Sequence, residues 1–196
     1  GLFVSTGKEC LWLDAGTGET ITTYPAPEAA DGKPRTWAYI AVVGDTLFGS
    51  TSAKSQESDS LFAVDIASGK PKWRYDGKAI RNNTISISDG RVFFADNAAT
   101  SQQRQAALST KVSELVERKK IAPADAEKEL KSADVRVAVA LDAETGDALW
   151  QRPLDLTDCG ASVLSAMATR GTVVFCGAHA NGHFWPQFLQ GEYAAR

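Results

Sequence analysis

The sequence predicts an all-β fold built from repeated antiparallel four-stranded sheets, and three observations support this prediction. A turn motif recurs three times, a second series of turn glycines repeats alongside it, and short apolar or alternating runs fill the chain between the turns. The chain has 196 residues, of which 43% are hydrophobic and 23% charged, so it is long enough to bury a core.

The turn motif consists of an apolar residue, Asp, two variable residues, Thr or Ser, Gly and a polar residue. Its copies span 13–19, 64–70 and 141–147, with Asp14, Asp65 and Asp142 and with Gly18, Gly69 and Gly146 at matching positions. Asp accepts hydrogen bonds from N–H groups two or three residues further on, and Gly adopts a positive φ without steric cost. We therefore interpret these residues as turn formers rather than as calcium ligands or acid–base carboxylates.

The turn glycines Gly44, Gly90 and Gly171 form the second series, and each precedes an apolar strand. Both series place an additional stretch of about 30 residues inside the third repeat. The predicted strands are 2–6, 9–14, 19–24; 37–42, 45–51, 60–65, 71–75; 83–88, 91–96, 135–142, 148–152; 162–169 and 172–177. With the four strands of a repeat lettered A to D, the repeats 1–25, 36–76, 83–152 and 162–196 supply strands BCD, ABCD, ABCD and AB.

Four-stranded meanders that recur every 40–50 residues are typical of a β-propeller. The chain 1–196 is thus predicted to be a propeller fragment of about three and a half blades. The additional stretch, 102–132, is predicted to be a helical hairpin between strands B and C of the third repeat. Its apolar stripe consists of Leu108, Val112, Leu115 and Val116, a Glu114–Arg118 ion pair is expected beside it, and a second helix is expected from Pro123 to Leu130.

Two tryptophans, Trp73 and Trp150, each follow a motif glycine by four residues, whereas Thr22 takes this position in the first copy. The pattern Asp-x-x-Thr/Ser-Gly-polar-x-x-Trp resembles the tryptophan-docking repeat of the pyrroloquinoline-quinone-like propellers. These include quinoprotein alcohol dehydrogenases and the propeller lipoprotein of the bacterial outer-membrane barrel assembly machinery. The run 60–65 and the tail 183–185 are most similar to large uncharacterised propeller proteins of planctomycete-like bacteria. The resemblance implies that both tryptophans lie on outer strands, largely buried between neighbouring blades.

Candidate ligand-binding residues are few. His179 and His183 have a spacing that suits a metal on a helix, but the glycines and proline around them favour a polar loop. Arg81, Asn82 and Asn83 are expected in the loop that leads into strand A of the third repeat, near the central channel, where a ligand or partner could bind.

Several function classes are disfavoured by composition. The net charge is −3 and the basic residues are scattered, which disfavours nucleic-acid binding, and no apolar run reaches the roughly 20 residues of a membrane span. The start of the chain carries no recognisable targeting signal, and three cysteines outside any CxxC pair do not define a compartment.

We expect a non-catalytic scaffold without a cofactor in the periplasm or cell envelope, completed by the remaining blades of the same propeller. Because successive connections of a meander emerge on opposite sides, the short A–B and C–D turns share one face and the long B–C and D–A loops share the other. The long-loop face is expected to bind a protein or polymer partner. The alternatives are part of a dehydrogenase that uses pyrroloquinoline quinone with calcium, and an accessory propeller attached to another catalytic domain.

Overall fold

The computed structural model describes residues 1–28, 32–52, 57–108, 110–159 and 164–177, and these form antiparallel sheets joined by tight turns. The first sheet contains β1 (Leu2–Ser5), β2 (Glu9–Leu13) and β3 (Thr20–Pro25). The second contains β4 (Thr36–Val43), β5 (Thr46–Ser52), β6 (Glu57–Asp65), β7 (Pro71–Arg81), β8 (Ser86–Ser88), β9 (Arg91–Asp96), β10 (Val135–Asp142) and β11 (Ala148–Asp155). The third is the pair β12 (Ser165–Thr169) and β13 (Thr172–Cys176). This all-β architecture is that of a β-propeller fragment, as the sequence predicts.

The large sheet consists of two four-stranded meanders joined at one point. Strands β4 to β7 pair in chain order, as do β8 to β11, and the single bridge between the two meanders pairs Ile80 with Asp96. The Asp96 side chain is fully buried and accepts hydrogen bonds from the backbone N–H groups of Lys78 and Ala79. The last residues of β7 pair with Glu57 and Ser58 at the start of β6, and the Asp96 bonds hold this part of β7 against β9. For these reasons β7 continues to Arg81 rather than ending near residue 75 as predicted.

The predicted strand 83–88 is divided into two elements. Residues Asn82–Thr84 form the 3-10 turn η1, and β8 begins only at Ser86. The buried Thr84 side chain stabilises this turn, because its hydroxyl donates to the carbonyl of Arg81 and accepts from the N–H of Ala95. Arg81 is therefore the last residue of a strand, and Asn82 and Asn83 lie in a short turn rather than in a long loop.

The segment between β9 and β10 contains three short helices, α1 (Ser101–Ala107), α2 (Val112–Lys119) and α3 (Pro123–Lys131). The predicted continuous stripe from Leu108 to Val116 is wrong, because Leu108 is the C-cap of α1 and the chain leaves helical geometry before α2. Glu114 acts as a cap, since its carboxylate accepts a hydrogen bond from the Lys111 N–H at 3.3 Å. The α2 and α3 helices occupy the predicted hairpin, whereas α1 was not predicted.

The apolar side chains between the sheets form the core. One cluster includes Phe48, Trp73 and Phe94, and a second joins the first sheet to the next through Tyr24, Trp37 and Phe62. Trp37 meets Phe62 edge-on, with ring centroids 4.9 Å apart. Gly49 makes this contact possible, because a Cβ there would lie 2.3 Å from the Trp37 ring.

Trp73 connects the first meander of the large sheet to a turn of the second meander. Its side chain is buried, and its indole N–H donates to the carbonyl of Ala143 at 2.9 Å. Gly146 gives the ring space, since a Cβ there would lie 2.7 Å from the Trp73 ring, and its φ of +77° is a value that glycine adopts freely. The Trp73 side chain thus packs directly on the turn formed by the third copy of the motif.

Tyr24 makes the equivalent connection in the first repeat. The carbonyl of Ile66 follows Asp65 as that of Ala143 follows Asp142, and the Tyr24 hydroxyl donates to it at 2.8 Å. Tyr24 is 3% exposed and lies two residues after Thr22, the position that aligns with the tryptophans. The Tyr24 phenol, on the same strand as Thr22, therefore supplies the hydrogen-bond donor to the turn that a tryptophan supplies in the second repeat.

We expect the substitution Tyr24→Phe to lower the free energy of unfolding by about 1 kcal/mol, because it leaves the Ile66 carbonyl without its donor. Urea unfolding of the full-length protein measures this loss. Tyr39→Phe is the matched control, since the Tyr39 hydroxyl has no hydrogen bond among the described residues, and we expect a change of at most about 0.5 kcal/mol there. Equal effects of the two substitutions would contradict the role of the Tyr24 hydroxyl.

Trp150 does not have the buried environment that the sequence predicts. It lies on β11 opposite Ala140, as Trp73 lies on β7 opposite Ala63, yet it is 41% exposed. Its ring contacts Phe93 with a centroid distance of 6.1 Å. The expectation of a largely buried Trp150 is wrong for the described part of the chain, where Trp150 has no turn equivalent to 142–146 against it.

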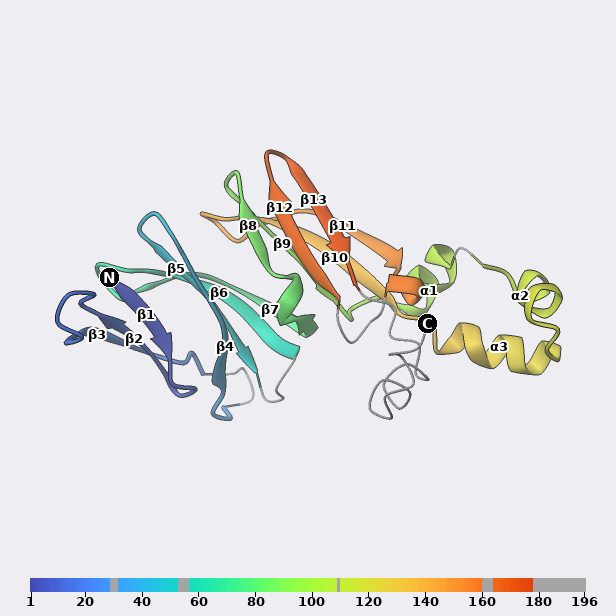
Figure 1. Ribbon diagram of the computed structural model, residues 1–196, viewed down its shortest axis with the longest axis horizontal. Coiled ribbons are helices and arrows are strands. Elements are labelled where there is room, and N and C mark those ends of the chain that lie inside the picture. The colour runs from blue at the N-terminus through green and yellow to red at the C-terminus, as the bar shows by residue number, and fades with distance from the viewer. Residues whose placement is uncertain (29–31, 53–56, 109, 160–163, 178–196) are drawn as a thin grey trace, which may run out of the picture.

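The two ends of the sheets differ in what they carry (Figure 1). The hairpin turns β4–β5, β8–β9 and β12–β13 lie at the upper ends of their sheets, and the three helices project from the right-hand end of the molecule. We call the end with the hairpin turns the turn face and the opposite end the loop face. The loop face comprises the start of β6, the end of β7, η1, the helices and the start of β10.

Candidate functional site

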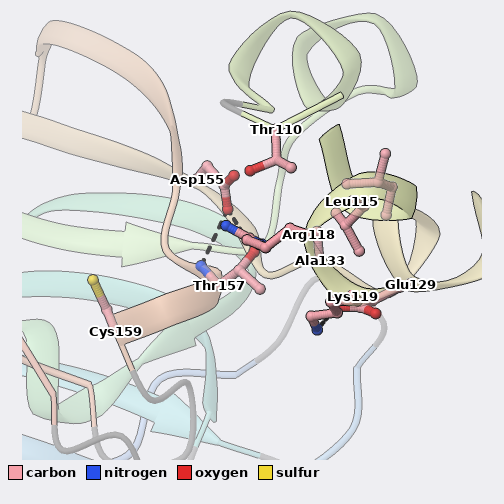
Figure 2. Close-up of a pocket in the computed structure, with 10 residues that line it drawn as sticks. Thr110, Leu115, Arg118, Lys119, Glu129, Ala133, Asp155, Thr157 and Cys159 are labelled. Carbon is pink, nitrogen blue, oxygen red and sulfur yellow. Dashed lines mark hydrogen bonds and ion pairs between the residues drawn. The ribbon is translucent and has the colours of Figure 1, made fainter. Parts of the chain in front are cut away.

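A hollow of about 520 Å³ lies on the loop face where the helices meet the end of β11 (Figure 2). Helices α2 and α3 line one side, and the other side is formed by the segment from β11 through η2 (Thr157–Cys159). Its lining residues are Thr110, Leu115, Arg118, Lys119, Glu129, Leu130, Ala133, Asp155, Thr157 and Cys159. Leu115 is 3% exposed, so the hollow combines an apolar patch with polar and charged walls.

The walls of the hollow are held by local hydrogen bonds. The Asp155 carboxylate accepts from the Thr157 N–H at 3.1 Å, and the Thr157 hydroxyl accepts from the Asp134 N–H at 3.1 Å. Lys119 pairs with Glu129 across α2 and α3. Arg118 is exposed and, among the described residues, makes no ion pair or hydrogen bond, which leaves its charge available to a ligand in the hollow.

Arg104 attaches α1 to the sheet beside this hollow. Its guanidinium donates to the carbonyl of Lys131 at 3.2 Å and also to those of Ala133 and Val135. These carbonyls follow α3 and begin β10, so one side chain ties the first and last parts of the helical segment together. The helices are thus fixed to the sheet rather than attached only through their connections.

A charged cluster of Glu57, Arg81, Asp134 and Arg136 adjoins the hollow. Glu57 Oε1 lies 3.4 Å from Arg81 Nε and 3.7 Å from Arg136 Nη1, so it bridges two meanders of the large sheet. Arg136 also pairs with Asp134, with 2.9 Å between Nε and the carboxylate, and Arg136 as a whole is 5% exposed. Its Nη1 is buried and has no hydrogen-bond partner among the described residues.

The predicted candidates Arg81, Asn82 and Asn83 occupy the edge of this cluster in three different ways. Arg81 belongs to the cluster itself. Asn82 faces inward, because its Oδ1 accepts hydrogen bonds from the hydroxyls of Ser50 and Ser58. Asn83 is exposed. Asn82 therefore organises buried hydroxyls, and only Asn83 presents an uncommitted side-chain surface.

The repeated motif residues lie at the turn face. The Asp14 carboxylate accepts from the N–H groups of Gly16 and Thr17, and Asp142 accepts from those of Glu144 and Thr145. Asp65 accepts from both the N–H and the hydroxyl of Ser68. These bonds hold the pKa of each carboxyl below its usual range, with the Thr17 N–H, the Ser68 hydroxyl and the Thr145 N–H as the largest causes. Gly18, Gly69 and Gly146 complete the turns with positive φ angles of 75°, 68° and 77°.

Lys72 forms a charged link between the two meanders of the large sheet on the turn face. Its ammonium group donates to the Glu144 carboxylate at 3.0 Å and to the Thr46 hydroxyl at 2.9 Å. The bond to Glu144 raises the pKa of Lys72. The motif aspartates and Lys72 are therefore occupied with holding turns and meanders together on the turn face.

A calcium-held quinone does not fit the described residues. They contain no group of three or more His, Cys, Asp or Glu side chains arranged to hold a metal. Cys10, Cys159 and Cys176 are all free thiols, and none is adjacent to another in the sequence. His179 and His183 lie outside the described residues. None of the helices in the described ranges is both long and apolar enough to cross a membrane.

Two buried charged residues of this region were not predicted as site residues from the sequence. Asp96 and Arg136 fall outside the repeated motif, and each sits in an apolar run that reads as an ordinary buried strand. A charged residue inside such a run is the signal that could have identified them, because buried charges require partners.

The chain is similar to several solved structures, and the first of them supports the fold. The chain is similar to the crystal structure of BamB from Moraxella catarrhalis, with 13% identity and a TM-score of 0.51, over 88% of this chain and 40% of that one. It is also similar to a europium-containing methanol dehydrogenase, with 11% identity and a TM-score of 0.45, over 77% and 22% of the chains. The Pan2 WD40 domain of Neurospora crassa gives 10% identity and a TM-score of 0.45, over 80% and 37%. No curated protein sequence matches the chain.

The chain spans 40% of the length of the first of these structures. A family model described as outer membrane protein assembly factor BamB matches residues 3–182, which is nearly the whole chain. On this match the chain belongs to the family of the outer membrane protein assembly factor BamB.

Proposed function

We propose that this chain is part of a non-catalytic propeller scaffold that binds a protein or polymer partner through its loop face in the bacterial cell envelope. The carrying observation is the asymmetry between the two faces. Both faces are hollowed in the described part of the chain, and the hollow of about 440 Å³ beside the β4–β5 turn belongs to the turn face. The loop face differs in carrying the three inserted helices, a hollow of about 520 Å³ with charged walls, and the exposed Arg118 and Asn83. Binding functions commonly reside on elaborate loops held by a rigid scaffold.

The family supports this proposal by analogy. The family is named for outer-membrane protein assembly, and a scaffold in such an assembly contacts other proteins. We also propose that the sheets correspond to blades with the boundaries predicted from the sequence, and that further blades of the same propeller complete the ring. The helical segment differs in charge from the rest of the chain. Residues 101–132 hold seven Lys and Arg against five Asp and Glu, whereas the whole chain is net negative. This difference fits a binding role for the segment that the sheets do not share.

Deleting residues 102–132 from the full-length protein is expected to spare folding but to weaken partner capture in a pull-down by about tenfold or more. The sheets keep their cores because, of the helical side chains, the buried ones are Leu115 and Ala126, and neither belongs to a core cluster of the sheets. A melting curve checks the folding of the deletion variant.

The matched control replaces Glu19 and Lys70 on the turn face with alanine, which should leave capture unchanged. Loss of capture with the turn-face variant but not with the deletion would show that the partner binds the other face. Failure of the deletion variant to fold would show that the helices are structural.

A further inference from the structure

We propose that the Glu57 carboxylate occupies a recognition site for a carboxylate of an acidic polypeptide partner, and that the partner displaces it from Arg136 and Arg81. This inference rests on the proposed partner-binding function of the loop face. The partner would carry carboxylates, and without the partner Glu57 would fill the site and inhibit binding.

Arg136 is the basis of this assignment. Its side chain is 6% exposed, and its Nη1 has no hydrogen-bond partner among the described residues. A buried guanidinium N–H without an acceptor is costly, so an acceptor is expected there in some state of the protein. The Nε edge of the same group is already paired with Asp134, which fixes the orientation of the guanidinium.

Glu57 reaches this guanidinium with poor geometry. Its Oε1 lies 3.7 Å from Arg136 Nη1 and 3.4 Å from Arg81 Nε. Well-formed guanidinium–carboxylate hydrogen bonds measure about 2.7–2.9 Å and are commonly bidentate. Glu57 therefore neutralises the two arginines without satisfying Arg136 Nη1, as a weak internal substitute would.

The occupied position can exchange with an outside ligand. The Glu57 side chain is 33% exposed, whereas that of Arg136 is almost fully buried, so the open side of the cluster is the side on which Glu57 lies. When Glu57 swings into solvent, its place is open to another carboxylate. The outgoing carboxylate is then hydrated, which limits the cost of displacement.

A polypeptide is the partner that the surroundings favour. The hollow adjoins the cluster through Ala133 and Asp134, and it offers Leu115 and Leu130 together with the free cation of Arg118. A segment that alternates acidic and aliphatic side chains would place one carboxylate at Arg136, a second at Arg118 and an apolar group between them. A planar carboxylate is also the group that the cluster already accommodates.

The test measures binding of a fluorescein-labelled peptide of alternating glutamate and leucine to the full-length protein by fluorescence anisotropy. Glu57→Gln should tighten binding about fivefold, because it removes the competing charge. Arg136→Lys should weaken binding about fivefold or more, since lysine keeps the charge but loses the fork that accepts a carboxylate. Glu19→Gln, which makes the same charge change on the turn face, should leave the affinity unchanged.

Melting curves of all three variants establish that they are folded. If one of the two cluster variants is unfolded, the affinity of the other still tests the inference, because Glu57→Gln is expected to tighten binding and Arg136→Lys to weaken it. Unchanged affinity in a folded cluster variant overturns the inference, as does binding to phosphatidylglycerol vesicles in place of the peptide. Such a result leaves the scaffold proposal intact, since that proposal is judged by partner capture after deletion of 102–132.

Discussion

Replacing Trp73 with alanine is expected to lower the free energy of unfolding by about 3–5 kcal/mol, the range for truncating a buried aromatic side chain. The indole is buried between Phe48 and the turn that contains Gly146, and its loss also leaves the Ala143 carbonyl without a donor. Urea unfolding of the full-length protein, followed by circular dichroism, measures the change.

Trp73→Phe separates the two contributions to this effect. It keeps an aromatic ring in the contact but removes the N–H donor, so a smaller loss of about 1–2 kcal/mol is expected. If Trp73→Ala costs less than about 1 kcal/mol, the contact between β7 and the turn at 142–146 does not stabilise the fold.

Replacing Asp96 with asparagine is expected to lower the free energy of unfolding by about 2–3 kcal/mol, because a buried hydrogen-bond network loses an acceptor. The carboxylate accepts hydrogen bonds from the N–H groups of Lys78 and Ala79. Asparagine would turn an amide NH₂ toward these donors. The same measurement as for Trp73 applies.

The environment of Tyr75 is consistent with this network. Burial, followed by the negative charge of Asp96 and the hydrogen bond to it, raises the pKa of Tyr75 to about 12. Asp76→Asn is the matched control for Asp96→Asn, because the Asp76 side chain is 66% exposed and pairs only with Arg74 among the described residues. A change of at most about 0.5–1 kcal/mol is expected there. Equal losses in the two variants would contradict a special role for Asp96.

Much of the fold follows from local patterns in the sequence. The repeated Asp and Gly positions define turns, and the apolar runs between them locate the strands, because turn chemistry and side-chain alternation act over a few residues. The predicted end of β7 near residue 75 is wrong because its extension depends on pairing with Glu57 and Ser58 and on hydrogen bonds to Asp96, which are distant along the chain. The prediction of one helical stripe from Leu108 to Val116 is wrong for a related reason, because helical spacing alone does not show that a helix ends at Leu108.

The candidate site was harder to predict than the fold. Arg81 was identified from its position near a loop. Glu57 begins β6, whereas Asp134 and Arg136 lie at the start of β10, so these residues meet only when the two meanders pack together. The role of Tyr24 was not predicted for a similar reason, because Tyr24 lies two residues beyond Thr22, the position that aligns with the tryptophans. Contacts between repeats depend on spatial neighbours that no single repeat contains.

The aromatic links between repeats have a consequence for how this family can diverge. In both links the donor is a side chain, Tyr24 or Trp73, but the acceptor is a backbone carbonyl, of Ile66 or Ala143. A carbonyl is present whatever residue occupies the position, so the receiving turn can change its side chains without losing the joint. A repeat can therefore be duplicated or exchanged beside a new neighbour and still be held, provided that the incoming strand brings one aromatic donor and the receiving turn keeps its shape.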